Sequence, residues 1–175
     1  MIKRTIMLSK LDFLKEKEIA QVAFVVKDLD EAVSHYYEVF GIGPWSFYTY
    51  QKPFVKEMSY RGKPANYSMR IALSNIGPMR IELIQNLSGE SVYKEFIENH
   101  GYGIHHLGVV VDDIEKEILK AKSIGIEMIM DGKGFGLDGD GHYAYLDTED
   151  LIGTTIELIS RPKRRHEPEL VYPLT

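Results

Sequence analysis

The chain contains two copies of one pattern, and this internal repeat constrains its fold more than any other feature. Residues 21–33 (QVAFVVKDLDEAV) align with residues 106–118 (HLGVVVDDIEKEI), with the apolar and acidic positions in step. A second matched pair follows, at residues 80–84 (RIELI) and 155–159 (TIELI). Because self-similarity within a chain indicates a repeated structural unit, we expect two related halves.

Each half is expected to begin with a strand that leads into a helix. Nearly continuous apolar runs rich in β-branched residues, at 22–26 and 107–111, predict the strands. Asp28 and Asp113 then stand where the free N–H groups of a helix start need a side-chain acceptor. The same order of strand, cap and helix is therefore predicted in both halves.

The helices are predicted at residues 29–40 and 114–124, and Gly41 and Gly125 end them, since glycine adopts positive φ at little cost. After each helix the pattern predicts about three further strands. A third short helix, with apolar residues on one side, is predicted at residues 91–99 between the halves. Each half is thus expected to contain one strand, one helix and about three more strands.

The ends of the duplication set the expected domain boundaries. The first 18 residues form an N-terminal arm, whose apolar residues are expected to pack on the body or on a partner subunit. The last part contains prolines and is expected to be extended. The expected organisation is an arm at 1–18, one domain at 19–160 with modules 19–88 and 104–160 joined by the linker helix segment 89–103, and a tail at 161–175.

Composition excludes several classes of function. The 175 residues, 44% of them hydrophobic and 27% charged, match one globular domain. A net charge of -5 argues against a nucleic-acid binder, which needs a basic surface. The basic run Arg161, Lys163, Arg164 and Arg165 is interpreted as a solvated tail.

Cysteine is absent, which excludes disulfides and thiolate chemistry, so any metal must be held by His, Glu, Asp or Gln. No apolar run approaches the roughly 20 residues that span a bilayer. The N-terminal residues also lack the apolar stretch and small-residue cleavage site of a signal peptide. We therefore expect no membrane partner and a cytoplasmic location.

Four polar side chains occupy equivalent places in the two halves. Gln21 and His106 stand at the start of the first strands, and Glu82 and Glu157 stand between Ile and Leu in the last strands. A single such residue is more often exposed to solvent or satisfied in a core. Two matched pairs that would face each other across a pseudo-two-fold axis instead predict one divalent metal site, with a mixed N/O ligand set suited to Zn, Ni, Co, Mn or Fe(II).

Residues 19–160 resemble the vicinal-oxygen-chelate superfamily, which includes glyoxalase I, methylmalonyl-CoA epimerases, extradiol dioxygenases and bleomycin-resistance proteins. The segment IELIQNLSGESVYKEFIENHGYGIHHLGVVVDDI, residues 81–114, looks most like the epimerases. The resemblance implies an α+β fold of two tandem βαβββ modules that form a cupped mixed β-sheet around a central metal cleft. It also implies a homodimer and a small-molecule substrate.

The ligand set Gln21, Glu82, His106 and Glu157 is similar to that of zinc-dependent glyoxalase I, so zinc is the first expectation for the metal. Epimerases and extradiol dioxygenases usually have histidine at the position of Gln21. An Fe(II) extradiol-type dioxygenase is therefore only the second alternative. The first alternative is a non-catalytic small-molecule or antibiotic-binding protein of the same fold.

The resemblance implies proton abstraction next to a carbonyl group, with Glu157 as the first candidate base and Glu82 as the second. Among aromatic residues, Trp45, Tyr48 and Tyr143 are candidates for a substrate wall, although core packing is the competing interpretation.

Two polar residues complete the candidate substrate site. Arg70 could bind an anionic group, because a guanidinium matches a carboxylate or phosphate, although solvent exposure competes with this interpretation. Asn86 matches a glutathione-contacting position of glyoxalase I.

Two further expectations concern neighbours of the site. By strand alternation, His105 should point away from His106. The glycine-rich segment 131–141 fits GxGxxG, but the strand-like HYAYLD follows it, so nucleotide binding is rejected and a lid over the cleft is the alternative. Asp138 and Asp140 only weakly suggest a calcium loop.

Overall fold

The computed structural model describes residues 11, 15 and 17–174. The predicted N-terminal arm therefore lies mostly outside the described residues, and two of its described residues, Leu11 and Lys17, contact the body. Leu11 packs against a buried cluster of the second half, and the ammonium group of Lys17 pairs with Asp112 at 2.8 Å.

The strand–helix–strand order of both halves agrees with the sequence pattern. The first half consists of β1 (Ile19–Val25), α2 (Leu29–Phe40), β2 (Trp45–Tyr50), β5 (Ser68–Ile76) and β6 (Met79–Ser88). The helix α3 (Val92–His100) links it to the second half. That half consists of β7 (Gly103–Val110), α4 (Ile114–Ser123), β8 (Met128–Phe135), β9 (Gly141–Leu146), the short helix α5 (Glu149–Ile152) and β10 (Thr155–Ser160).

The predicted helix caps are confirmed. The Asp28 carboxylate accepts a hydrogen bond from the backbone N–H of Glu31 at 2.9 Å, and Asp113 accepts one from Lys116 at 3.0 Å. Gly41 ends α2 in the left-handed conformation, with φ at 67°. These local signals fix where both helices begin and where the first one ends.

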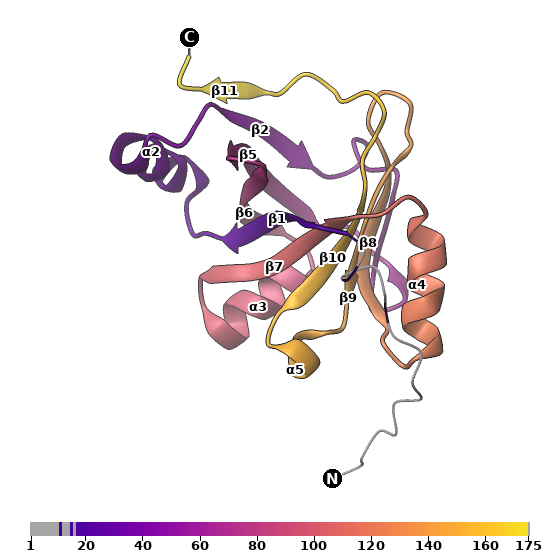
Figure 1. Ribbon diagram of the computed structural model, residues 1–175. Coiled ribbons are helices and arrows are strands. Elements are labelled where there is room, and N and C mark those ends of the chain that lie inside the picture. The colour runs from indigo at the N-terminus through magenta and orange to yellow at the C-terminus, as the bar shows by residue number, and fades with distance from the viewer. Residues whose placement is uncertain (1–10, 12–14, 16, 175) are drawn as a thin grey trace.

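The strands of both halves join into one curled sheet (Figure 1). Across the described residues the order is β11-β2-β5-β6-β1-β7-β10-β9-β8-β3-β4. The two first strands, β1 and β7, meet antiparallel at the centre, and each runs parallel to the last strand of its own half, β6 or β10. This pseudo-two-fold arrangement confirms the expected α+β fold with a cupped mixed sheet.

The sheet contains more strands than two βαβββ modules supply, because each half adds short strands to the edge of the other half. The hairpin of β3 (Glu57–Tyr60) and β4 (Lys63–Pro64) leaves the first half and pairs with β8 of the second half. In return β11 (Leu170–Tyr172), which follows the second half, pairs with β2 at the far edge of the first half. Residues 170–172 of the predicted extended tail therefore form an edge strand.

The helices α2 and α4 cover the outer face of the curl, whereas side chains, including some from α3, fill its inner face. Leu29 and Val33 of α2 pack with Trp45 on the outer face of the first half. Ile114 and Ala121 of α4 do the same for the second half. A third cluster, rich in tyrosine, fills the concave side. None of the helices in the described part of the chain is both long and apolar enough to cross a membrane.

Candidate metal centre and active site

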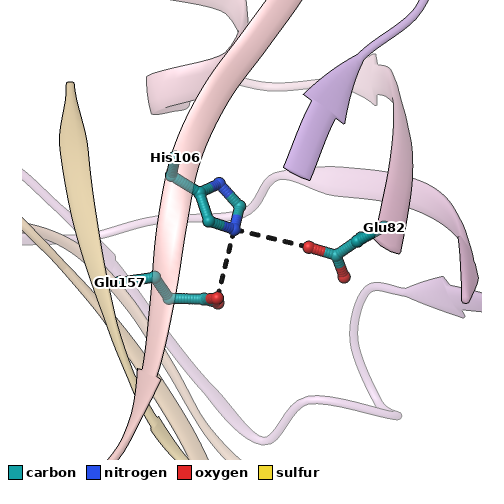
Figure 2. A group of neighbouring side chains, drawn as sticks. All are labelled: Glu82, His106 and Glu157. Atoms are coloured by element: carbon teal, nitrogen blue, oxygen red, sulfur yellow. Dashed lines mark ion pairs between the residues drawn. The ribbon is translucent and has the colours of Figure 1, made fainter. Parts of the chain in front are cut away.

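Three strands bring ionisable side chains to one point on the concave side of the sheet. Glu82 from β6, His106 from β7 and Glu157 from β10 each offer one ligand atom, and these atoms all lie within 4.8 Å of one another. The Nε2 atom of His106 lies 3.4 Å from Glu82 and 3.1 Å from Glu157, as the dashed lines in Figure 2 show. Such spacing is close enough for one ion to contact all three.

Gln21 completes the group from the central strand β1. Its Nε2 atom donates to Glu82 at 2.9 Å and to Glu157 at 3.0 Å, and it lies 3.4 Å from Nε2 of His106. A half-turn of the amide would exchange Nε2 for Oε1 and present an oxygen to a cation. The structure thus brings together all four residues that the duplication paired.

Sheet register explains why they meet. In the first half Ala23 is the Cα partner of Glu82, and in the second half Gly108 is the partner of Glu157. These small residues lie two positions after Gln21 and His106, respectively. A Cβ atom on Gly108 would lie 2.9 Å from Cβ of Gln21 and 3.1 Å from Oε2 of Glu157, so a larger residue would push these two side chains away.

The electrostatics of the group favour a cation. Glu82 and Glu157 are 7% and 5% exposed and His106 is fully buried. Burial raises the pKa of Glu82, and the charge of Glu157 raises it further. For His106, burial lowers the pKa, but the two carboxylates more than offset this and raise it to about 9. Because two buried carboxylates outnumber one imidazolium, the donor set fits a divalent ion, with one imidazole nitrogen and three oxygens.

Metal affinity is expected to rise with pH. With a pKa of about 9, His106 carries a proton at pH 7 in the metal-free protein, and a metal must displace it. Displacement of one proton increases the affinity about tenfold per pH unit. The rise should continue through pH 8 and level off above about pH 9. Competition with a zinc chelator at pH 7, 8 and 9 measures it.

The matched control is His106→Gln, which cannot take up a proton. Its weaker zinc affinity should vary much less with pH than that of the native chain. An affinity of the native protein that stays flat between pH 7 and 9, after correction for the chelator, would show that His106 holds no proton there.

His105 is placed differently from the expectation. The register between β1 and β7 shifts between Ala23 and Phe24, and this irregularity breaks the strand alternation. As a result His105 does not point away from its neighbour: its Nδ1 atom lies 2.9 Å from Nδ1 of His106. Burial lowers the pKa of His105 well below its usual value, and His105 also bonds to the backbone of Val92.

When a neutral His105 donates its other ring N–H to the backbone of Val92, its Nδ1 atom is free to accept a hydrogen bond from Nδ1–H of His106. This contact would hold the His106 ring with Nε2 toward Glu82 and Glu157, the role that outer partners play for metal-binding histidines. The prediction from strand alternation, that His105 points away from His106, did not include this contact.

A cavity whose lining includes Gln21, Glu82 and Glu157 lies beside the four residues. The hydroxyl of Tyr145 donates to Oε1 of Glu157 at 3.0 Å, and Tyr143 lies next to it with its ring 6.0 Å away. The remaining wall is mainly apolar and aromatic. It includes Tyr50, Met69, Ile71, Leu73, Tyr93, Phe135 and Ile159. Such a lining excludes water around a small polar centre.

The structure distinguishes, for each aromatic candidate, between a place in the cavity wall and core packing. Tyr143 lines the cavity. Trp45 is fully buried under α2, and Tyr48 faces a neighbouring groove instead. Core packing therefore accounts for Trp45.

The two polar candidates also have partners outside the cavity. Arg70 pairs with Asp30 at 2.6 Å and lies over the ring of Phe47. Asn86 accepts a hydrogen bond from the hydroxyl of Ser91, the N-cap residue of α3, at 3.0 Å. Neither residue is among those that line the cavity beside the four converging residues.

The glycine-rich segment contributes structure rather than a nucleotide site. Residues up to Phe135 belong to β8, and β9 follows at Gly141, so no helix starts there. Asp138 pairs with Arg164, and Asp140 accepts from the backbone N–H of Lys163 at 3.3 Å. Both aspartates thus hold the C-terminal tail, which explains them without calcium.

The basic run of the tail is only partly solvated. Lys163 and Arg164 are exposed as expected. Arg161 is also exposed and Arg165 is half-buried, and both border the cavity together with Arg80 of β6. The prediction of a solvated run therefore holds for Arg161, Lys163 and Arg164 but not for Arg165, because the tail folds back across the sheet to reach β2.

Comparisons with known proteins agree with this geometry. Mouse mitochondrial methylmalonyl-CoA epimerase is 25% identical over 138 residues, covering 78% of this chain and 69% of the relative. Among solved structures, a hypothetical protein from Bacillus halodurans C-125 matches with a TM-score of 0.59 and 23% identity, over 86% of this chain and 99% of its own. Methylmalonyl-CoA epimerase from Mycobacterium tuberculosis matches with a TM-score of 0.56 and 22% identity, over 82% and 87%.

The two structural matches show the fold. The family follows from the sequence itself: residues 20–145, which include the first strand, Glu82 and His106, match the Glyoxalase/Bleomycin resistance protein/Dioxygenase superfamily. The chain belongs to the glyoxalase/bleomycin resistance protein/dioxygenase superfamily.

Proposed function

We propose that the protein is a metal-dependent isomerase or lyase that removes a proton from the carbon next to a carbonyl group. Its substrate would be a small organic acid, thioester or thiohemiacetal. The observation that carries the proposal is the buried convergence of Gln21, Glu82, His106 and Glu157 at the edge of a cavity. The epimerase relatives support the same class of reaction.

In this proposal the four residues hold a divalent ion, with zinc as the first expectation. When bound, such an ion polarises a carbonyl oxygen and so acidifies the neighbouring C–H group. The residues fit this role because they supply one imidazole nitrogen, one amide oxygen and two carboxylate oxygens.

Glu157 is the first candidate for the group that takes and returns the proton. The hydroxyl of Tyr145 donates to its Oε1 atom at 3.0 Å and so orients the carboxylate whichever way the amide of Gln21 is turned. A fixed base next to the reacting carbon loses little entropy when it reacts.

Glu82 is the second candidate. It reaches His106 from a different direction than Glu157 does, and it belongs to the other half of the sheet (Figure 2). Burial raises its pKa, which makes it a stronger base than a solvated carboxylate. Two carboxylates of different halves give an epimerase one group for removal of the proton and one for its return.

The apolar wall contributes by excluding water. Tyr143, Phe135 and Ile159 line the cavity next to the carboxylates. Low water content strengthens the interaction between a developing negative charge on the substrate and a positive centre. A homodimer and a cytoplasmic location stay part of the proposal, and sedimentation of the purified chain tests the former.

The proposal is tested by metal analysis followed by proton exchange. Protein purified without chelators is expected to contain about one divalent ion per chain. In deuterated water it should exchange the α-proton of at least one compound in a panel of α-substituted acids, thioesters and thiohemiacetals. Treatment with EDTA should stop the exchange and added zinc should restore it.

Other outcomes would decide for the alternatives. Bound compounds without any exchange would indicate a binding protein. Iron content with oxygen consumption on catechols would indicate a dioxygenase. Exchange that is unaffected by EDTA would contradict the metal-dependent mechanism.

A further inference from the structure

Three arginines border the cavity that the metal centre opens into: Arg80, Arg161 and Arg165. Arg80 lies on β6, two residues before Glu82, so both side chains are on the same face of the strand. Arg161 follows the end of β10, four residues after Glu157. Two of the arginines, Arg80 and Arg161, therefore lie on or directly after the strands that carry Glu82 and Glu157.

Strand directions place these two arginines at the same end of the cavity. The strand β6 runs parallel to β1, β1 runs antiparallel to β7, and β7 runs parallel to β10. It follows that β6 and β10 run in opposite directions. A residue before Glu82 and a residue after Glu157 consequently lie toward the same end.

The third arginine comes from the C-terminal tail, which is fastened on both sides of it. The carbonyl of Arg164 accepts from the backbone N–H of Leu137 at 3.0 Å, and its guanidinium binds Asp138. On the other side, the ring of His166 lies 5.0 Å from that of Phe54. These contacts hold the intervening Arg165 over the cavity.

Arg80 and Arg165 also line a second, more polar groove, which contains Ser46, Ser74 and Asn75. The two guanidinium groups thus stand between the metal cavity and this groove. A molecule that extends from one to the other must pass them.

Within the described part of the chain, none of the three guanidinium groups is paired with a carboxylate within salt-bridge distance. Burial lowers the pKa of Arg80, and the positive charges of Arg165 and Arg161 lower it further. Glu82 and Glu157, which line the same cavity, raise the pKa of Arg80 but do not outweigh burial and the two arginines. The three like charges therefore still repel one another, and an anion among them would relieve this repulsion.

We propose that Arg80, Arg161 and Arg165 bind an anionic group of the substrate, a carboxylate or a phosphate. That the anion is part of a substrate rests on the proposed function. That these arginines bind an anion does not depend on it. Because Arg80 is only two residues from Glu82, about 7 Å along a strand, the anionic group lies a few bonds beyond the reacting carbon. The substrate class is then a carbonyl compound with a second, anionic end.

The test uses malonate and inorganic phosphate as probes, titrated by calorimetry into the full chain. Metal-free protein is the main sample, since malonate could otherwise bind a metal directly. Arg165→Gln is expected to weaken binding of the preferred anion by about tenfold or more, the effect of losing one charged, bidentate partner. The probe that binds more tightly identifies a carboxylate or a phosphate as the source.

Lys163→Gln is the matched control, because it removes the same charge from an exposed position of the same tail. It should leave anion affinity within about twofold of the native value, apart from weak long-range effects that salt screens. Arg161→Gln provides a second variant. Arg161 is exposed, and its side chain has no hydrogen bond or ion pair with any described residue that would fasten the tail. Its loss should therefore weaken binding without a change in melting temperature.

Anion binding that survives both arginine substitutions would overturn the proposal. Equal losses in Lys163→Gln and the arginine variants would overturn it too, since net charge alone would then explain the effect. A protein that binds the anion through these arginines but lacks metal or proton exchange would refute the proposed function and still support this site.

Discussion

Replacement of His106 by alanine is expected to lower the affinity of the protein for zinc by more than about a hundredfold. Loss of an outer partner of a metal ligand already lowers affinity by about 10- to 100-fold, and His106 is the only nitrogen ligand of the proposed set. It also stands at the centre of the group, within 3.4 Å of Glu82 and 3.1 Å of Glu157. Competition with a chromophoric chelator at pH 8 measures the change.

His35→Ala is the control, because it removes an exposed histidine of α2 that lies outside the site. Its zinc affinity should equal that of the native chain. The metal-free His106→Ala variant should also unfold more easily, since it leaves two buried carboxylates without their imidazolium partner. Far-ultraviolet circular dichroism checks that it is still folded at the temperature of the titration. Zinc affinity within a factor of ten of the native value would exclude His106 as a ligand.

The duplication made the fold predictable from sequence. Two copies of a strand that ends in a capping aspartate, Asp28 or Asp113, specify the same unit twice. Two such units bury their apolar faces best by pairing their first strands, which β1 and β7 do. The equivalence of positions in the two halves then gives the convergence of Gln21 with His106 without further information.

The edges of the sheet could not be predicted in this way. The hairpin β3–β4 and the strand β11 occur once each, so the repeat carries no signal for them. Their partners, β8 and β2, are the edge strands of the opposite halves. Which short segment covers an exposed edge depends on the complete sheet rather than on local periodicity.

Two features of the site were missed for related reasons. Alternation assumes an unbroken strand, and the register shift in the pairing of β7 invalidates it at His105. The position of the basic residues 161–165 depends on the path of the chain after β10, which local sequence patterns do not determine. One signal was nevertheless present in the sequence: Arg80 occupies the position of Thr155 in the other half. A charged residue that breaks an otherwise matched pair indicates asymmetric function.

Glu157→Gln is expected to reduce α-proton exchange by at least about a hundredfold, the lower end of what general acid–base catalysis contributes. Glutamine has nearly the same shape and still offers an oxygen to a metal, but it cannot accept the proton. The assay follows exchange into deuterated water by nuclear magnetic resonance, with zinc at a saturating concentration. Saturation separates the loss of the base from weaker metal binding.

Comparison with Glu82→Gln assigns the two carboxylates. The hydroxyl of Tyr145 fixes Glu157. Among the described residues, Glu82 bonds to Gln21 and pairs with His106 but has no such hydroxyl partner, so the smaller loss is expected for Glu82→Gln. Glu38→Gln, at an exposed position of α2, should not change the rate. If Glu157→Gln keeps the native rate while Glu82→Gln abolishes exchange, Glu82 is the base. Undiminished exchange in both variants would mean that neither carboxylate takes the proton, and the duplicated pair would then serve only to hold the ion.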